Sequence, residues 1–241
     1  MSMKKHKNLV FIDIETVSGT QQFEDLTEEY KTQWTKKAGH LRGIDDLSVD
    51  EAYSQRSAIY AEFGKIVCIS IGYCVKDKQE ECHLRIKSIT NSDEKSLLAE
   101  FCELMENKFD ERSIILCAHN GKEFDYPYLA RRMVINEVKL PVFLQLSGKK
   151  PWQVKHIDTM ELWKFGDWKS YTSLELLTTA LGIPSTKTDL DGSMVSKVFY
   201  ELDDLDRIAR YCAQDVIATA QIYFRFVGKK MIESDHIHII V

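Results

Sequence analysis

Strand-like and helix-like apolar patterns follow one another along this chain in an order that few folds can satisfy. Three strand-like segments come first, at residues 8–15, 65–75 and 81–89, and two shorter ones follow at 113–118 and 154–159. Helical spacing of apolar residues separates the later strands. Strands that alternate with helices after an initial run of three strands indicate an α/β sandwich with a mixed sheet. We therefore expect an α/β fold in which helices flank a mixed central β-sheet.

The same patterns predict the helices and the domain organisation. We expect helices at about 94–108 and 124–136, helical pieces at 173–181 and 194–200, a long helix at 205–226 and a small strand at 235–241. Residues 21–60 are polar and helix-like, with Trp34 and Tyr53 as anchors. No linker divides the chain, and 241 residues with 44% hydrophobic content are enough for one core. The prediction is a single domain over residues 1–241 with a helical insertion at about 17–62.

The composition limits the possible partners and compartments. A net charge of −5 is unfavourable for binding phosphate groups, although two bound divalent cations would bring it to −1. The alternative is that the acidic charge only keeps the protein soluble. No segment reaches the ~18 apolar residues of a membrane span. Most of the six cysteines lie in apolar runs and none forms a C-x-x-C pair, so we expect reduced core thiols and a cytoplasmic protein.

Two acids interrupt the first strand-like segment. Asp13 and Glu15 are two residues apart, so the alternation of side chains along a strand places both carboxylates on one face. Val10, Ile12 and Ile14 then pack on the other face. Two acids on one face of a core strand are costly unless something positive compensates them, and hard divalent cations prefer oxygen ligands. The pattern indicates a metal site, the alternative being a strand end that reaches solvent.

Two further acids lie on predicted helices. Asp125 follows a strand and a His-Asn-Gly turn and falls in the first turn of a helix, where either a site or the helix dipole explains an acid. Asp215 falls within the apolar stripe of the last helix, and Tyr211 lies one turn before it on the same face. A carboxylate in an apolar stripe needs a partner or a metal ion. Together, four acids can hold two ions that clamp a phosphodiester, with the Tyr211 hydroxyl holding the attacking water.

Three segments carry these residues: FIDIET (11–16), HNGKEFDYPYLARR (119–132) and YCAQDV (211–216). They resemble the three exonuclease motifs of the DEDD superfamily, and the Y-x-x-x-D form of the third is typical of its tyrosine branch, DEDDy. The N-G-x-x-F-D form of the second motif is similar to the proofreading domains of family B DNA polymerases. The resemblance covers about residues 8–227 and is closest to stand-alone, predicted family B polymerase-like 3′–5′ exonucleases.

The resemblance implies a ribonuclease H-like fold and a hydrolase that uses two Mg²⁺ or Mn²⁺ ions. It assigns Asp13, Glu15, Asp125 and Asp215 as metal ligands and Tyr211 as the residue that positions water. It places Thr16, Asn120 and Phe124 nearest the terminal nucleotides of the substrate. Because no polymerase domain is attached, any proofreading would act in trans with a DNA polymerase or repair partner.

Single-stranded DNA is the expected substrate, because the second motif is of the family B type. An exoribonuclease of the same superfamily is the alternative, since no motif reads the 2′-hydroxyl that distinguishes RNA. A catalytically silent nucleic-acid-binding module is the other, although all five site positions hold the expected residue types. The insertion after Thr16 either covers the substrate strand or is a purely structural lid.

Overall fold

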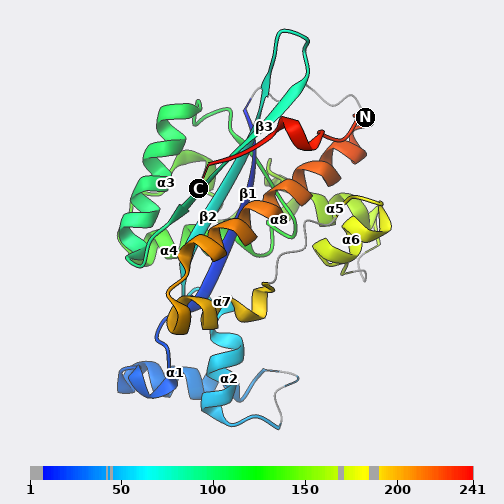
Figure 1. Cartoon of the computed structure of the whole chain (residues 1–241). Helices are drawn as coiled ribbons and strands as arrows, with labels where there is room; N and C mark the ends of the chain where they lie inside the picture. Colours follow the sequence, from blue (N-terminus) through cyan, green and yellow to red (C-terminus); the bar gives the residue numbers. More distant parts are fainter. Residues whose placement is uncertain (1–7, 42, 44–45, 168–170, 185–189, 241) are drawn as a thin grey trace.

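A mixed sheet of six strands forms the centre of the molecule (Figure 1). The computed structural model describes residues 8–240 except 42, 44–45, 168–170 and 185–189. The strands are β1 (Leu9–Ser18), β2 (Gly64–Lys76), β3 (Cys82–Thr90), β4 (Ile115–Ala118), β5 (Ile157–Asp158) and β6 (Ile237–Ile240), in the spatial order β5-β4-β1-β2-β3-β6. β1, β2 and β3 form an antiparallel meander, β4 and β5 run parallel to β1, and β6 runs parallel to β3. The expected α/β class with a mixed sheet is confirmed, and this topology agrees with a ribonuclease H-like fold.

Helices cover both faces of this sheet. The α-helices of the described residues are α1 (Glu28–Ala38), α2 (Val49–Arg56), α3 (Glu94–Lys108), α4 (Asp125–Ile135), α5 (Thr159–Lys164), α6 (Leu174–Ala180), α7 (Val195–Lys197) and α8 (Leu205–Phe226). One face of β1 packs against α8, where Phe11 joins a buried cluster with Val216 and Ala220. The opposite face, represented by Ile12, packs against α3 and α4 in a second core that includes Leu129. The alternation along β1 therefore separates two cores, as the sequence predicts.

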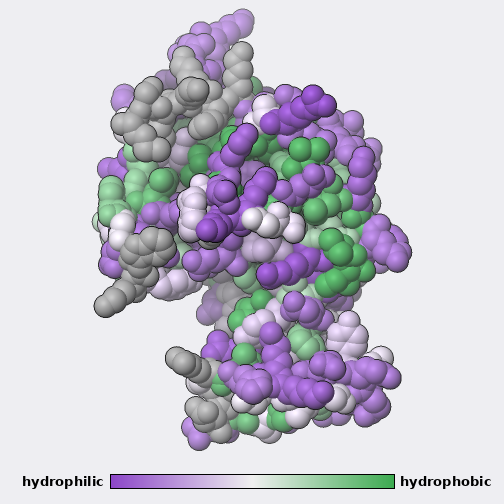
Figure 2. All heavy atoms as spheres, turned by 180° about the vertical axis from the view of Figure 1, so that it is seen from behind, coloured by the Kyte–Doolittle hydropathy of each residue, from purple (hydrophilic) through white to green (hydrophobic). Residues whose placement is uncertain are grey.

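Helices α1 and α2, between β1 and β2, form a lobe at one end of the sheet (Figure 1). Seen from behind, this lobe joins the body through a narrower connection (Figure 2). Trp34 and Tyr53 are fully buried in its centre, with ring centroids 5.4 Å apart. The Trp34 indole Nε1–H donates to the carbonyl of Val49 at 3.0 Å. Both expected anchors are confirmed, and the lobe has a small core of its own.

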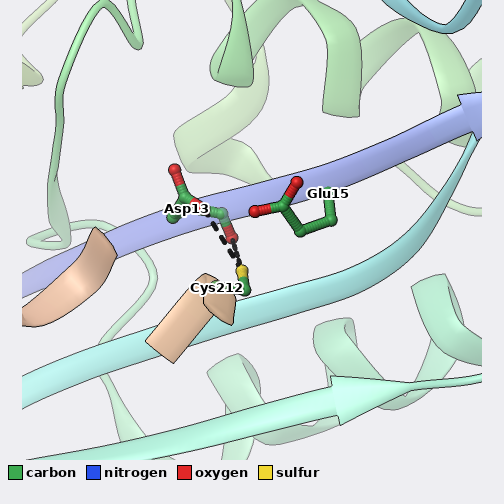
Figure 3. A group of neighbouring side chains, drawn as sticks. All are labelled: Asp13, Glu15 and Cys212. Carbon is green, nitrogen blue, oxygen red and sulfur yellow. Dashed lines mark hydrogen bonds between the residues drawn. The ribbon is translucent and has the colours of Figure 1, made fainter. Parts of the chain in front are cut away.

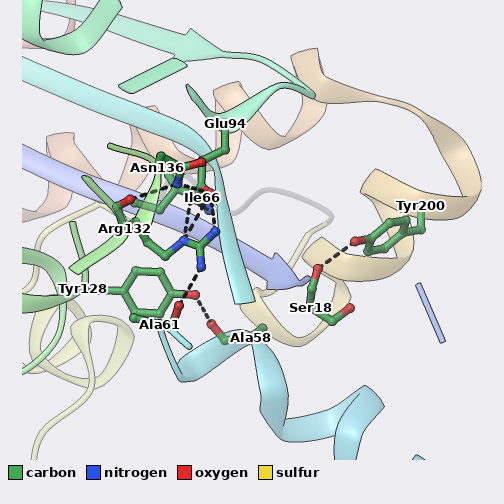
Figure 4. A network of polar contacts seen from close by, with 9 residues as sticks. All are labelled: Ser18, Ala58, Ala61, Ile66, Glu94, Tyr128, Arg132, Asn136 and Tyr200. Atoms are coloured by element: carbon green, nitrogen blue, oxygen red, sulfur yellow. Dashed lines mark hydrogen bonds and ion pairs between the residues drawn. The ribbon is translucent and has the colours of Figure 1, made fainter. Parts of the chain in front are cut away.

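Polar contacts from α4 hold the chain where it returns from the lobe to the sheet (Figure 4). The Tyr128 hydroxyl donates to the carbonyl of Ala58 at 2.8 Å, and the Arg132 guanidinium donates to that of Ala61 at 2.7 Å. Arg132 also forms an ion pair with Glu94, the first residue of α3. Because both members of this pair are largely buried, removing either partner alone would leave an uncompensated charge.

The segment before α8 makes a matching contact where β1 ends. The helical piece expected at 194–200 is present, and its second part continues from α7 as a π-helical turn, η6 (Val198–Leu202). The Tyr200 hydroxyl of this turn donates to the carbonyl of Ser18 at 2.7 Å (Figure 4). Both ends of the lobe are therefore tied to elements that lead into the predicted site.

Two sequence-based expectations need correction. The strand expected at 154–159 is reduced to β5, because the ring Nδ1 of His156 accepts the backbone N–H of Leu116 at 3.1 Å, a bond that strand pairing would otherwise use. The expectation of reduced thiols is wrong for Cys74 and Cys82, which form a disulfide across the β2–β3 hairpin. The remaining cysteines are free. No helix in the described part of the chain is long and apolar enough to cross a membrane.

Candidate active site

Asp13 and Glu15 lie where β1 separates from β4. The two strands pair only over Leu9–Phe11, so the chain that follows β4 can approach β1 beside these acids. The side chains of both acids lie on the same face of β1 as those of Phe11 and Val17, because side chains alternate along a strand. Phe11 and Val17 pack on the α8 side of the sheet. Figure 3 shows the two carboxylates projecting from β1 toward the same space. The sequence prediction that the two acids share a face is confirmed.

Asp125 enters this space from the start of α4, and only 4% of it is exposed. The turn before it is held by Asp158, whose carboxylate accepts the backbone N–H groups of Asn120 at 2.9 Å and Lys122 at 3.1 Å. The same carboxylate caps α5, so it fixes two chain segments at once. Asp158 is 3% exposed and is a positioning residue for the turn that presents Asp125.

Helix α8 brings Tyr211 and Asp215 to the same place. Its apolar residues contribute to three buried clusters: Ile208 packs toward the end of β1, Val216 packs against Phe11, and Ile222 packs against α6. Asp215 lies between these contacts, close enough to the other acids to raise their pKa values. Tyr211 is half-buried one turn earlier, and the same carboxylates contribute to raising its pKa. The structure therefore brings together all five residues predicted from the motifs.

Burial and mutual repulsion make the ionised state of these acids expensive. Burial raises the pKa of Asp13 and of Glu15 well above the usual range, and the neighbouring carboxylates add to the effect. Burial is also the largest cause that raises the pKa of Asp125 and of Asp215 to about 7. Burial raises the pKa of Tyr211 above its ordinary value, so this side chain keeps its proton at neutral pH. Such a group of oxygen donors is chemically suited to divalent cations.

Cys212 is a site residue that the sequence reasoning did not identify. Its thiol donates to the Asp13 carboxylate at 3.2 Å and lies 3.4 Å from the backbone carbonyl oxygen of the same residue (Figure 3). Asp13, Glu15 and Cys212 offer potential metal-ligand atoms that all lie within 4.8 Å of one another. The available signal was the position of Cys212 beside Tyr211 on the inward face of α8. A serine or alanine at position 212 would remove the thiol that contacts the Asp13 carboxylate.

The three predicted substrate contacts lie around the start of α4. Asn120 has a left-handed backbone with φ of 63°, and its buried side-chain oxygen Oδ1 has no hydrogen-bond partner among the described residues. Phe124 is half-buried, with its ring centroid 5.2 Å from that of Tyr128. Burial raises the pKa of Tyr128 overall, whereas the Thr16 side chain, which lies near the Tyr128 hydroxyl, acts to lower it. Thr16 and Phe124 thus both lie near Tyr128, whereas the Oδ1 atom of Asn120 is available to accept a hydrogen bond from a ligand.

Comparison with known proteins assigns the family. Residues 59–236 match the family described as predicted 3′–5′ exonucleases related to the exonuclease domain of PolB. The chain belongs to this PolB-related exonuclease family. The matched residues include Asp125, Tyr211 and Asp215, whereas β1 with Asp13 and Glu15 precedes them.

Individual relatives of this chain are larger proteins. It is 25% identical over 143 residues to the catalytic subunit of DNA polymerase epsilon from Debaryomyces hansenii. The aligned stretch is 56% of this chain but only 6% of that polymerase. A family B DNA polymerase from the archaeon Pyrobaculum calidifontis superimposes with a TM-score of 0.49 and 12% identity, covering 95% of this chain and 26% of that one.

The raised pKa values predict how the stability of the protein responds to pH in the absence of metal ions. A carboxyl group whose pKa is higher in the folded than in the unfolded state stabilises the fold at low pH, and this contribution is lost as pH rises through the folded value. For Asp215 that window runs from about 4 to about 7. In EDTA, Asp215→Asn should therefore melt above wild type at pH 8, and this advantage should shrink toward pH 5.

The comparison between variant and wild type is needed because buried histidines act in the opposite direction. Burial lowers the pKa of His156 to about 4 and also lowers that of His119, so acid destabilises the fold through these residues. Thermal unfolding in EDTA from pH 5 to 8 measures the difference directly. A stability difference that does not change with pH would contradict a raised Asp215 pKa.

Proposed function

We propose that this protein is a 3′–5′ exonuclease that hydrolyses phosphodiester bonds from the 3′ end of single-stranded DNA by a two-metal-ion mechanism. The observation that carries the proposal is the convergence of four buried or half-buried carboxylates with raised pKa values from β1, α4 and α8. Four acids that face one another do not stabilise the fold by themselves, because their mutual repulsion opposes folding. A pair of divalent cations removes that repulsion, which supports a metal-binding role.

The site residues then divide into metal ligands and groups that position the ligands or the water. Asp13, Glu15, Asp125 and Asp215 would hold two Mg²⁺ or Mn²⁺ ions. Such ions, when bound, supply an activated water and stabilise the leaving oxygen of a displacement at phosphorus. Tyr211 orients the attacking water through its hydroxyl group, because burial and the nearby carboxylates keep it protonated. Cys212 donates to Asp13 and fixes the orientation of that carboxylate.

The substrate strand is held by the residues around the start of α4. Oδ1 of Asn120 has no hydrogen-bond partner within the described part of the chain, and a terminal nucleotide can satisfy it, since a buried polar atom without a partner is costly. Phe124 offers an aromatic face on which a base can stack, as single-strand-binding proteins commonly use. The relation to the exonuclease domain of a DNA polymerase supports DNA over RNA as the substrate.

The test is to incubate the purified protein with 5′-labelled single-stranded DNA, RNA of the same sequence and a blunt DNA duplex. With Mg²⁺ or Mn²⁺ we expect a ladder of progressively shorter labelled DNA, and with EDTA no shortening. The single strand should be degraded faster than the duplex, because separating terminal base pairs costs a few kcal/mol. Undiminished activity in excess EDTA, or immediate release of the labelled 5′ nucleotide, would refute the mechanism. Faster degradation of RNA would favour the exoribonuclease alternative.

A further inference from the structure

Three histidines that are far apart in the sequence meet at the β3–β6 edge of the sheet. His83 lies on β3, His236 ends the turn before β6, and His238 lies on β6. The ring nitrogen Nδ1 of His83 is 3.1 Å from Nε2 of His238. The His236 ring stacks on that of His83, with centroids 4.1 Å apart. This cluster is formed by the parallel pairing of β3 with β6.

The histidines are remote from the carboxylates of the proposed catalytic site. On β2, Cys68 is the pairing partner of Glu15, and Val75 is the pairing partner of His83. These two positions on β2 are seven residues apart, which corresponds to about 23 Å of extended strand. Any function of the histidine cluster is therefore spatially independent of the exonuclease mechanism.

The distance between the two ring nitrogens suits either a shared proton or a shared metal ion. Two imidazole nitrogens bound to one tetrahedral Zn²⁺ lie about 3.3 Å apart, given bonds of about 2.0–2.1 Å. The observed separation between His83 Nδ1 and His238 Nε2 is 3.1 Å, so a metal ion needs only a small movement of the rings. Both side chains are partly accessible, which allows an ion to enter from solvent.

The other ring nitrogen of His83 has the partner that a metal-binding histidine needs. Its Nε2 is 3.5 Å from the Asp77 carboxylate. The other oxygen of Asp77 accepts the backbone N–H groups of Gln79 and Glu81, each at 2.9 Å, and these bonds are among the causes that lower its pKa. An ionised carboxylate at Nε2 favours the tautomer with its proton on that atom, which leaves the lone pair of Nδ1 facing His238.

The surroundings are also rigid and negatively charged. The Cys74–Cys82 disulfide closes the hairpin immediately before His83. The Glu81 carboxylate lies 3.8 Å from Nε2 of His236, so two acids, Glu81 and Asp77, flank the three rings. Two nearby carboxylates would offset the charge of a divalent cation, and imidazole nitrogens suit zinc, copper and nickel.

We propose that His83 and His238 form a two-histidine binding site for a divalent transition-metal ion such as Zn²⁺, with the stacked His236 ring beside it. Asp77 orients His83 within this site. The bound ion fastens the C-terminal strand β6 to β3, so its effect is on stability and not on phosphodiester hydrolysis.

The test is Zn²⁺ binding and thermal unfolding of protein freed of metal by chelation. Wild type should bind a Zn²⁺ ion that His83→Gln and His238→Ala fail to bind, and Zn²⁺ should raise the melting temperature only where that site is intact. Asp77→Asn should weaken binding by about ten- to a hundredfold, the range for removing the partner of a ligating histidine. His40→Ala, at an exposed histidine of the lobe, should bind as wild type does.

Two further measurements keep the test decisive. Asp215→Asn should retain the histidine-dependent Zn²⁺ ion, which separates this site from binding by the catalytic carboxylates. His238 is exposed, so His238→Ala is expected to fold, and circular dichroism checks this. Equal Zn²⁺ stoichiometry and equal thermal shift in wild type, His83→Gln and His238→Ala would overturn the proposal. The cluster would then be only a stack of hydrogen-bonded rings.

Discussion

Replacing any one of Asp13, Asp125 or Asp215 by asparagine should lower the rate of 3′-terminal hydrolysis by about a thousandfold or more. Asparagine keeps the shape of the side chain but removes the charge that holds a divalent cation. The metal-free protein should keep or gain stability, because each substitution relieves repulsion among carboxylates whose pKa values are raised. Rates on labelled single-stranded DNA, Mn²⁺ titration by calorimetry and thermal unfolding in EDTA measure the three effects separately.

A matched control lies two residues before Asp125. Glu123 is exposed and lies 4.0 Å from the ammonium group of Lys164, outside the group of converging acids. Glu123→Gln removes one negative charge from the same turn and should leave the rate and the metal affinity close to wild type. If the three aspartate variants instead lost much of their stability in EDTA, the acids would be structural partners of unidentified groups and not metal ligands.

Local sequence signals predicted most of the elements of this fold. The helices expected at 94–108 and 205–226 have the same bounds in the structure, because an aspartate that can act as the N-cap precedes each of them. Asp93 accepts the backbone N–H of Ser96, and Asp204 accepts that of Arg207, each at 2.9 Å. The alternation of β1 likewise predicted which side chains pack and which face the site.

Features that depend on distant residues were not predictable in the same way. Asp158 organises the turn at Asn120 from 38 positions away. Cys212 contacts Asp13 across 199 positions, so its pairing depends on how α8 lies on the sheet. The contact of Arg132 with Ala61, which holds the returning end of the lobe, spans 71 positions. Local periodicity carries no information about such contacts, which arise only from packing.

Tyr211→Phe should lower the rate by about ten- to a thousandfold, the range for removing a positioning or acid–base group. The fold should be kept because the ring still packs beside Val195 and Cys212 in the same cluster. Metal affinity should also be kept, since no carboxylate is lost. The loss should be much smaller than that for Asp215→Asn, because the metal ions continue to activate the water that Tyr211 orients. Tyr223→Phe is a matched control, since it removes a hydroxyl from the same helix twelve residues further on.

The pH dependence of the rate distinguishes orientation of water from proton transfer. Burial is the largest cause that raises the pKa of Tyr211, followed by the nearby Asp215, so the hydroxyl does not ionise in the neutral range. The pH–rate profile of Tyr211→Phe should then keep the wild-type shape at a lower level, because metal-bound water still titrates. A rate equal to wild type would make Tyr211 an ordinary packing residue. A rate as low as that of the aspartate variants, with metal still bound and an ionisation missing from the profile, would make Tyr211 the general base.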